Sequence, residues 1–398
     1  MYPPVAKGVV QALRDIFEGG FPADKVIQRQ MKSNKKWGSS DRRMFAESVY
    51  DIVRWWRRLL FACGLEYPPA GNVYSQVLAA WCEIQKVPGT FQQNDASAVE
   101  LVARWKDSGA RAVRESLPNW LDQWGSEQLG GKWDEILPIL NSQAPVYLRC
   151  NRLKTTPEKL KSRLAAEQFD CAIVEGDCLR LKIRGNVFIS KAFKEGLFEM
   201  QDLNSQRVGL ALAPQPGERV IDGCAGAGGK GLHIAALMGN KGKVIALDVS
   251  EKKLANFRER SSRDGASCIE LKLIDSTKVI KRLHNSADRV LLDVPCTGTG
   301  VWRRNPDSKW RLTADEIARV AGLQTDILSS YSLMCKAGGR LVYSTCSIMP
   351  SENEQQIDKF LATRADEWKL ISQETLWPER DGPDGFFIAV LQRAGVPQ

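Results

Sequence analysis

The sequence is poor in histidine and has no long hydrophobic run. Its 398 residues include two histidines, His233 and His284, and its ten cysteines form no C-x-x-C pair. A zinc site built from clustered cysteine and histidine ligands is therefore not expected. No stretch approaches the roughly 18 apolar residues of a membrane span, and the amino-terminal segment lacks the basic and apolar regions of a secretory signal. We therefore expect a cytoplasmic protein with reduced cysteines and no metal.

The composition is that of a globular protein with a modest excess of positive charge. Hydrophobic residues make up 43% of the chain, which is enough for a sizeable core, and the length favours two or three domains. Lys and Arg number 56 against 47 Asp and Glu, which gives a net charge of +9. This excess favours an anionic partner such as RNA. Because no heptad pattern is visible, we expect a monomer.

Residues 1–140 have the pattern of an all-helical domain. Apolar residues recur every three or four positions over 40–60, which predicts one helix with a buried stripe. Five arginines lie on this segment, three lysines precede it, and eight of the twelve tryptophans occur by Trp133. Basic and aromatic side chains together can bind RNA. Aromatics at helical spacing are more often core residues, however, so both interpretations stay open here.

From residue 141 the pattern changes twice. Residues 141–205 mix strand-like runs with a helix that begins at Pro157, and we expect a small α+β subdomain there, with strands at 146–150 and 179–183. Residues 206–398 alternate strands with helices, which is typical of a mainly parallel α/β sheet of the Rossmann-like class. The expected strands are 218–224, 243–249, 270–275, 289–293, 340–345 and 386–392, and the expected helices lie near 251–263, 313–336 and 351–364.

A glycine-rich loop follows the first strand of the alternating region. Gly226, Gly228 and Gly231 match G-x-G-x-x-G, a loop that lets the backbone approach a cofactor and then begins a helix. A phosphate-binding P-loop is excluded because Cys224 and Gly231 stand where that motif needs glycine and a hydroxyl residue. The pattern alone fits a dinucleotide, S-adenosylmethionine or a tight turn.

Acidic residues end four successive expected strands: Asp222, Asp248, Asp275 and Asp293. In an open α/β sheet the carboxyl ends of the strands line the ligand crevice. Acids at this position suit the cationic sulfonium of S-adenosylmethionine better than the pyrophosphate of a dinucleotide. We therefore expect S-adenosylmethionine as the cofactor.

Two cysteines occupy corresponding positions after neighbouring strands. Cys296 lies in the motif DVPC and Cys346 in the motif YSTC. Because adjacent parallel strands lie about 5 Å apart, we expect both thiols in one crevice, where Lys230, Arg303 and Arg304 would favour the reactive thiolate. A single such cysteine is more often a small buried hydrophobe. A pair beside an acid indicates chemistry instead.

These motifs resemble the RNA cytosine carbon-5 methyltransferases of the Nol1/Nop2/Sun family. The resemblance covers about residues 145–393 and rests on LRCN and KT within 148–155, MQD and SQ within 200–206, the loop at 222–230, DVPCTGTGVWRRNPDSKW at 293–310, LVYSTCSIMPSENEQQI at 341–357 and DGFF at 384–387. The amino-terminal region resembles the helical fold of antitermination factor NusB through DRxxF at 41–45 and VYDxxR at 49–54. The combination is similar to bacterial enzymes that act on 16S ribosomal RNA.

The resemblance implies a covalent mechanism. Cys346 would attack carbon 6 of the cytosine and so make carbon 5 nucleophilic, Asp293 would hydrogen-bond or protonate ring nitrogen 3, and Cys296 would assist removal of the carbon-5 proton. Lys230 would order the active site. The target base would have to leave its stack to reach such a pocket. The implied cofactor contacts are Asp248 at the ribose, Asp275 at the adenine side, the loop residues Cys224, Ala225, Gly226, Ala227, Gly228, Gly229 and Lys230 at the methionine end, and Asp293.

The resemblance also implies a division of labour along the chain. Residues 1–140 would bind RNA, 141–205 would position it, and 206–398 would form the catalytic domain, with Arg303 and Arg304 near the phosphates of the target. Two loop residues depart from the family pattern. Ala227 and Gly231 replace a proline and a threonine, and the loss of the proline would loosen the cofactor turn.

Four alternatives stay open. Cys296 could be the nucleophile, as in DNA cytosine methyltransferases. A dinucleotide-dependent dehydrogenase would explain the glycine loop but leave both thiol motifs unused. An RNA-binding module without catalysis would leave Asp293 and both cysteines unexplained. Transfer RNA could replace ribosomal RNA as the substrate.

Overall fold

The computed structural model describes residues 1–87 and 95–395 of the chain. These residues divide into two compact units. The first comprises Met1–Gln143 together with Trp302–Thr313, and the second comprises Ala144–Val301 together with Ala314–Gln398. The division of labour at residues 140 and 205 stays a prediction about function.

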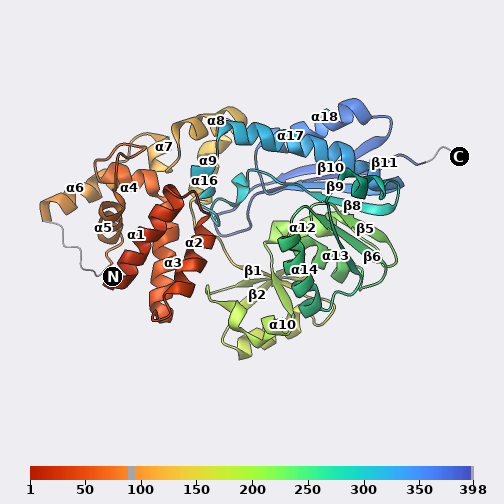
Figure 1. Cartoon of the computed structure of the whole chain (residues 1–398), viewed down its shortest axis with the longest axis horizontal. Coiled ribbons are helices and arrows are strands. Elements are labelled where there is room, and N and C mark those ends of the chain that lie inside the picture. Colours follow the sequence, from red (N-terminus) through yellow and green to blue (C-terminus); the bar gives the residue numbers. More distant parts are fainter. Residues whose placement is uncertain (88–94, 396–398) are drawn as a thin grey trace. The chain divides into compact units, whose positions relative to one another are not determined.

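The first unit is helical, as the sequence predicts for its amino-terminal part. Most of its helices come from Met1–Gln143, at the red and orange end of the colour scale in Figure 1. One short helix, α16, comes from the segment Trp302–Thr313. The helices are α1 (Pro3–Phe17), α2 (Ala23–Ser33), α3 (Ser39–Arg54), α4 (Trp56–Ala62), α5 (Tyr74–Ile84), α6 (Asp95–Lys106), α7 (Arg111–Arg114), α8 (Asn119–Leu129), α9 (Lys132–Leu140) and α16 (Ser308–Arg311).

The apolar stripe over residues 40–60 forms two helices rather than the single helix predicted. The backbone leaves the helical conformation at Trp55, where φ is −104° and ψ is 20°, so α3 ends and α4 begins there. Both helices contribute to the core, in which Phe45, Ile52 and Leu59 are completely buried. The tryptophans Trp37, Trp56, Trp81 and Trp133 are buried as well, which confirms the structural interpretation of these aromatics.

Two arginines of this region, Arg42 and Arg58, donate hydrogen bonds to backbone carbonyls of their own unit. The guanidinium of Arg42 donates to the carbonyls of Met31 and Trp37, at 2.8 and 3.0 Å. That of Arg58 donates to the carbonyl of Trp105 at 2.8 Å and lies 4.3 Å from the centre of its ring. These side chains are therefore committed to the fold, and the interpretation that they bind RNA is not supported for them.

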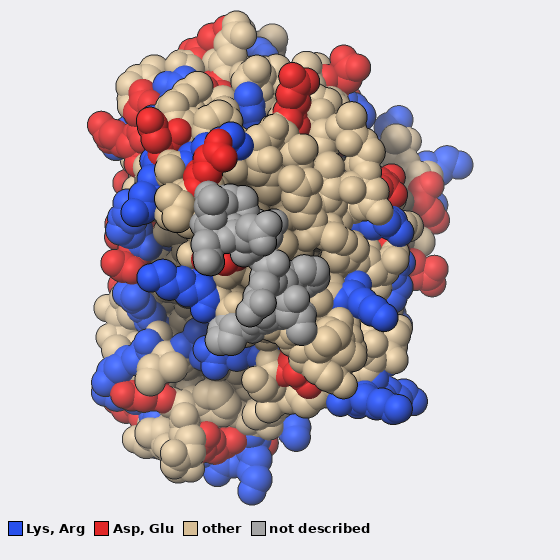
Figure 2. Space-filling view, turned by 90° about the vertical axis from the view of Figure 1, so that its left-hand side faces the viewer, with Lys and Arg blue, Asp and Glu red and all other residues tan. Residues whose placement is uncertain are grey.

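The surface of the described molecule mixes charges of both signs. Figure 2 shows a face on which Lys and Arg side chains are more numerous toward one margin, with Asp and Glu side chains lying among them. Lys32, Lys35 and Lys36, which precede α3, are exposed. On this face the positive charge is therefore denser toward one margin, without forming a patch free of acidic side chains.

Trp302–Thr313 packs within the helical unit although it continues the Cys296 motif along the chain. The ammonium of Lys309 is buried there and donates to the carbonyl of Arg54 (2.8 Å) and to Oδ1 of Asn141 (3.2 Å). Burial lowers the pKa of Lys309 well below its usual value. The ring of Trp302 stands edge-on to that of Trp133, with 6.0 Å between their centres. The helical unit is therefore completed by a segment from the carboxyl-terminal half of the chain.

The second unit contains a small antiparallel sheet. Its strand order is β2-β3-β1-β4, formed by β1 (Tyr147–Cys150), β2 (Cys171–Glu175), β3 (Cys178–Leu181) and β4 (Phe198–Met200). The helices α10 (Pro157–Ala166) and α11 (Lys191–Lys194) accompany it. The predicted start of α10 is correct, since Pro157 is its first residue and the hydroxyl of Thr156 accepts a hydrogen bond from the Lys159 amide. The strands β2 and β4 were not predicted.

A larger, mainly parallel sheet forms the centre of the second unit. Its order is β10-β11-β9-β8-β5-β6-β7; the pairs among β9, β8, β5, β6 and β7 are parallel, and β11 pairs antiparallel with β9 and β10. The predicted Rossmann-like α/β fold is confirmed. The strands are β5 (Arg219–Asp222), β6 (Lys243–Asp248), β7 (Ile269–Leu273), β8 (Ala287–Asp293), β9 (Cys335–Thr345), β10 (Trp368–Leu376) and β11 (Phe386–Arg393).

Helices cover both faces of this sheet, because alternate strand residues point to opposite sides. On β5, Val220 belongs to the core shared with α12, α13 and α14, whereas Ile221 belongs to the core shared with α15, α17 and α18 (Figure 1). These helices are α12 (Leu203–Leu212), α13 (Gly229–Leu237), α14 (Glu251–Asp264), α15 (Thr277–Lys281), α17 (Ala314–Tyr331) and α18 (Glu354–Arg364). Among the described residues, no helix is long and apolar enough to cross a membrane.

Candidate active site

The glycine loop joins β5 to α13 in a conformation that needs glycine. Gly226 and Gly228 have φ values of +56° and +91°, which side chains with a Cβ rarely adopt. A Cβ on Gly228 would also lie 2.2 Å from the buried ring of Phe257. At Gly226 and Gly229, by contrast, no described atom lies within 4 Å of an added Cβ. The loop therefore packs tightly on one side and is open on the other.

Two arginines hold the carbonyl groups of this loop from outside. Arg260 donates to the carbonyl of Ala227 at 2.6 Å, and Arg149 donates to that of Gly229 at 3.0 Å. Glu199 fixes Arg260 through an ion pair of 2.8 Å. Arg149 is almost completely buried, and this burial lowers its pKa to about 10. Ala227 stands where the family pattern has proline, and Arg260 of α14 restrains the turn there through its hydrogen bond to the Ala227 carbonyl.

The substitution of glycine for threonine at position 231 also has a packing reason. A Cβ on Gly231 would lie 2.7 Å from the ring of Phe257 and 3.1 Å from Oδ2 of Asp222. Phe257 fills the space beneath the loop, so a threonine would force it to move.

The acids at the strand ends have three different environments. Asp248 is buried and accepts hydrogen bonds from the amides of Gly226 (2.9 Å) and Ser250 (2.8 Å). Asp275 lies two residues beyond β7 and is exposed. Asp222 is 1% exposed, and neither of its carboxylate oxygens has a hydrogen-bond partner among the described residues. Burial, reinforced by the charge of Asp293, raises the pKa of Asp222 to about 7.

Lys230 and Asp293 form a close ion pair between α13 and the end of β8. The ammonium of Lys230 lies 2.6 Å from Oδ2 of Asp293, and the hydroxyl of Ser344 donates to Oδ1 at 2.9 Å. Their side chains are 11% and 28% exposed. The sequence placed both residues in the site, and the structure brings them into direct contact.

The two predicted thiols also lie together. Because β8 pairs in parallel with β9, the loops that follow these strands are neighbours, and the sulfur atoms of Cys296 and Cys346 are 3.3 Å apart. The hydrogen bond with Cys346, together with burial and the charge of Cys346, raises the pKa of Cys296 well above its usual value. The expectation that basic neighbours favour a thiolate is therefore wrong for Cys296, which keeps its proton.

Arg303 does not have the environment that the sequence suggested. It lies in the segment that belongs to the helical unit and is 2% exposed. A buried guanidinium is not available to RNA phosphates, so that prediction is wrong for Arg303. Arg304 belongs to the same segment and is half-buried.

Glu352 was not predicted, although it contacts both cysteine loops. It ends the short 3-10 helix η4 (Pro350–Glu352), is completely buried, and accepts hydrogen bonds from Thr297 and Ser347. Its position in the motif SENE gave no sign of this role, because Thr297 is 55 residues away in the sequence.

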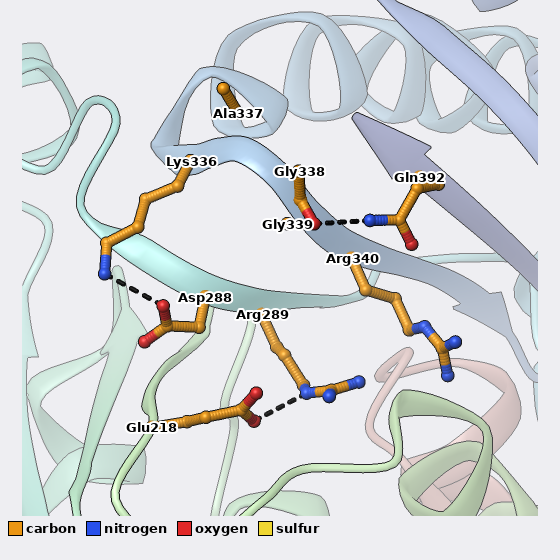
Figure 3. A pocket seen from close by; sticks show the side chains of 9 residues that line it. All are labelled: Glu218, Asp288, Arg289, Lys336, Ala337, Gly338, Gly339, Arg340 and Gln392. Atoms are coloured by element: carbon orange, nitrogen blue, oxygen red, sulfur yellow. Dashed lines mark hydrogen bonds and ion pairs between the residues drawn. The ribbon is translucent and has the colours of Figure 1, made fainter. Parts of the chain in front are cut away.

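A polar pocket at the other end of the strands is distinct from this site. Figure 3 shows Glu218 bonded to Arg289, Asp288 bonded to Lys336, and Gln392 donating to the carbonyl of Gly338. These residues lie where β5 and β8 begin, whereas the glycine loop and both cysteines follow the ends of those strands. Two of the three basic side chains are neutralised by the two acids, and Arg340 leaves one positive charge. Among the described residues, no group of three or more His, Cys, Asp or Glu side chains is placed to hold a metal ion.

Comparisons with known proteins agree with this geometry. The family described as 16S rRNA methyltransferase RsmB/F matches residues 209–392, and a ferredoxin-like domain of RsmF/B-like methyltransferases matches residues 117–187. The chain is 33% identical over 316 residues to ribosomal RNA small subunit methyltransferase B of Proteus mirabilis, covering 77% of this chain and 72% of that protein.

Solved structures are similar as well. The crystal structure of PH0851 superposes with a TM-score of 0.82 at 25% identity, covering 98% of this chain and 99% of that one. A methyltransferase homologue from Pyrococcus horikoshii superposes with a TM-score of 0.63 at 28% identity, covering 71% of this chain and 97% of that one.

Proposed function

The chain belongs to the 16S rRNA methyltransferase RsmB/F family, part of the Nol1/Nop2/Sun methyltransferases, and from this premise we propose that it methylates carbon 5 of a cytosine in small-subunit ribosomal RNA. The methyl donor is S-adenosylmethionine. The observation that carries the proposal is the pair of thiols 3.3 Å apart, beside an aspartate that is bonded to a lysine. A hydride-transfer enzyme needs no such pair.

The residues around the glycine loop fit S-adenosylmethionine. The open side of the loop at Gly226 and Gly229 leaves room for a ligand, and Asp222 has carboxylate oxygens without a described partner. Asp248 ends the next strand, where a carboxylate can bind ribose hydroxyls. Bound there, S-adenosylmethionine supplies an electrophilic methyl group. Asp275 and Asp293 complete the proposed contacts, at the adenine side and near the methionine end.

Cys346 is the proposed nucleophile. Carbon 5 of cytosine reacts weakly with an electrophilic methyl group, but addition of a thiolate to carbon 6 gives an enamine whose carbon 5 is electron-rich. Because Cys296 retains its proton, it can donate a hydrogen bond to the sulfur of Cys346. Asp293, held by Lys230 and Ser344, is the proposed group that hydrogen-bonds or protonates ring nitrogen 3 as negative charge develops there.

Cys296 is the proposed base of the second step. Once the sulfur of Cys346 is bonded to carbon 6, it no longer carries a charge. Two of the causes that raise the pKa of Cys296, the hydrogen bond with Cys346 and the charge of Cys346, are then weakened. Cys296, which is partly exposed, can then release its proton to solvent and, as a thiolate, take the proton from carbon 5. The electron pair of that C–H bond re-forms the double bond between carbons 5 and 6, and the sulfur of Cys346 leaves carbon 6 as a thiolate.

The helical unit and the small antiparallel sheet are proposed to position the RNA. The net charge of +9 and the exposed Lys32, Lys35 and Lys36 support an electrostatic contribution. Deleting residues 1–140 would not test this contribution alone, because Trp302–Thr313 packs in the helical unit and would lose the helices that surround it.

The test is nucleoside analysis of RNA after incubation with the protein and isotopically labelled S-adenosylmethionine. Unmethylated small-subunit ribosomal RNA and transfer RNA serve as parallel substrates. We expect labelled 5-methylcytidine in the ribosomal RNA, and a loss of at least about 1,000-fold with Cys346→Ser, since the nucleophile is removed. Label in another nucleoside, or only in the transfer RNA, would contradict the proposal.

A further inference from the structure

A single buried carboxylate joins the two loops that carry the cysteines. One oxygen of Glu352 accepts the backbone amide of Thr297 (2.8 Å), and the other accepts the hydroxyls of Thr297 and Ser347 (2.5 Å each). Thr297 directly follows Cys296, and Ser347 directly follows Cys346. Glu352 therefore fixes the residue next to each thiol.

Further hydrogen bonds connect Glu352, Thr297 and Ser347, together called the clamp, to the rest of the unit. The side-chain amide of Gln324, on α17, donates to Glu352 (3.0 Å) and to the carbonyl of Pro295 (2.9 Å). The hydroxyls of Thr299 and Ser347 are 2.9 Å apart and link the two loops directly. All of these groups except Pro295 and Thr297 are completely or almost completely buried. A donor that lost its partner here would have no water to replace it.

Within the clamp, the carboxylate of Glu352 meets only donors. Among the described residues Glu352 makes no ion pair, and its two oxygens accept four hydrogen bonds. A glutamine has the same shape, but its amide nitrogen is a donor, so the hydroxyls of Thr297 and Ser347 would have to rotate and accept, and they could no longer donate to this residue. Burying a charge without a cation is costly, so hydrogen bonding from both loops is what stabilises the carboxylate there.

The two loops depend on Glu352 to different extents. The Cys346 loop has further anchors in Asn353, which accepts the hydroxyl of Thr345 (2.6 Å) and donates to the carbonyl of Ser347 (3.0 Å). In the Cys296 loop, Gln324 still holds Pro295, but both hydrogen bonds that Thr297 donates go to Glu352. Cys346 also follows directly on β9, whereas Cys296 lies three residues beyond β8. Loss of the carboxylate should therefore displace Cys296 more than Cys346.

We propose that Glu352 is a positioning residue for the two-thiol reaction, an inference that rests on the function proposed above. It holds the sulfur of Cys296 where it can take the carbon-5 proton while Cys346 is bonded to carbon 6. Without the carboxylate, Cys346 still adds to the base, but Cys296 no longer reaches the proton. The enzyme then remains attached to its RNA.

The test measures turnover and covalent attachment together. Glu352→Gln should lower methyl turnover about 100-fold, as a displaced reacting group does, and should accumulate an RNA adduct that survives denaturing electrophoresis and disappears on nuclease treatment. Glu354→Gln is the matched control, because Glu354 lies two residues away and bonds Thr375 on β10 rather than either cysteine loop. It should show wild-type turnover and no adduct.

Wild-type turnover in Glu352→Gln, or reduced turnover without an adduct, would overturn the inference. Thr297→Val provides a second test if Glu352→Gln folds poorly, since it removes one hydroxyl donor from the half-buried end of the clamp. Thr297→Val should accumulate less adduct than Glu352→Gln. If Thr297→Val formed no adduct, that result would also contradict the inference. Cys296→Ala separates the two proposals. If it forms an adduct and Glu352→Gln does not, the positioning role fails alone; if it forms none, the covalent mechanism fails.

Discussion

Strand β8 has an aspartate paired with a lysine near each end, and the two pairs have different surroundings. At its carboxyl end, Asp293 and Lys230 are 28% and 11% exposed and lie 2.6 Å apart. At its amino end, Asp288 and Lys336 are 34% and 45% exposed and lie 2.9 Å apart. The amino-end pair stands beside a second, mutually neutralised pair, Glu218 with Arg289 (Figure 3). The carboxyl-end pair interacts electrostatically with Asp222, whose carboxylate oxygens have no hydrogen-bond partner within the described ranges, and the loop of Cys296 follows Asp293 directly.

The comparison shows how the same chemical pair can be structural or functional. The amino-end charges cancel locally and also secure a strand, since Asp288 accepts the amide of Arg219 on β5 at 2.8 Å. The carboxyl ends of the parallel strands instead open into loops that are free to carry reactive groups. What distinguishes the end proposed to be functional is therefore the groups around the pair, namely Asp222 and the two thiols, and not the pair itself.

The largest expected difference between the two ends is in catalysis. Lys230→Gln should lower methyl transfer about 100-fold, because Asp293 loses the cation that orients it at the target base. Lys336→Gln removes the same charge from the other end of β8 and should stay within about twofold of wild type, since a half-exposed pair contributes little. Initial rates under saturating cofactor would measure both. Equal losses in the two variants would remove the distinction between the ends.

A smaller difference is expected in the pH dependence of stability. The pKa of Asp222 is raised to about 7 by burial, so the folded state binds this proton more tightly than the unfolded state. The stability that Asp222 contributes is therefore fully present below its unfolded pKa, near 4, and is lost as the pH rises to 7. Relative to wild type, Asp222→Asn should gain on the order of 3 kcal/mol in unfolding free energy between pH 4 and pH 8.

Asp288→Asn is the matched control for this experiment. Burial raises the pKa of Asp288, but its hydrogen bonds with Lys336 and the Arg219 amide outweigh that effect and lower the pKa overall. Its contribution is therefore present above the unfolded pKa and is lost as the pH falls through the lower folded pKa, the opposite direction to Asp222. Because this pair is partly exposed, the effect should be below about 1 kcal/mol. Denaturant unfolding at several pH values, without cofactor, distinguishes the two. An Asp222→Asn profile parallel to wild type would contradict the assignment.

The sequence predicted the sheet wherever strands were continuous apolar runs. Residues 218–224 and 243–249 contain the parallel strands β5 and β6, which are buried after their first residue and whose apolar composition identifies them. The strand β10, with the sequence WKLISQETL, lies at the sheet edge and is not predicted from the sequence, because four consecutive polar residues interrupt its apolar positions. Likewise, the stripe over 40–60 predicted helix but not the interruption at Trp55, because the apolar spacing continues through it.

The candidate site was predicted where single motifs supplied the groups, and missed where distant segments combine. Cys296 and Cys346 followed from two similar strand ends. Glu352 did not, because its role depends on a contact with Thr297 across the fold. Arg303 was misjudged for the same reason: its motif continues from Cys296, while its side chain belongs to the helical unit. Sequence shows which groups are available, and packing decides which of them meet.

The measurement that tests the central claim most directly compares Cys296→Ala with Cys346→Ala by denaturing electrophoresis after incubation with RNA and S-adenosylmethionine. We expect a slowly migrating, nuclease-sensitive adduct with Cys296→Ala, because the nucleophile attacks but the product is not released. Cys346→Ala should form none. An adduct with Cys346→Ala and none with Cys296→Ala would exchange the roles of the two thiols and contradict the account.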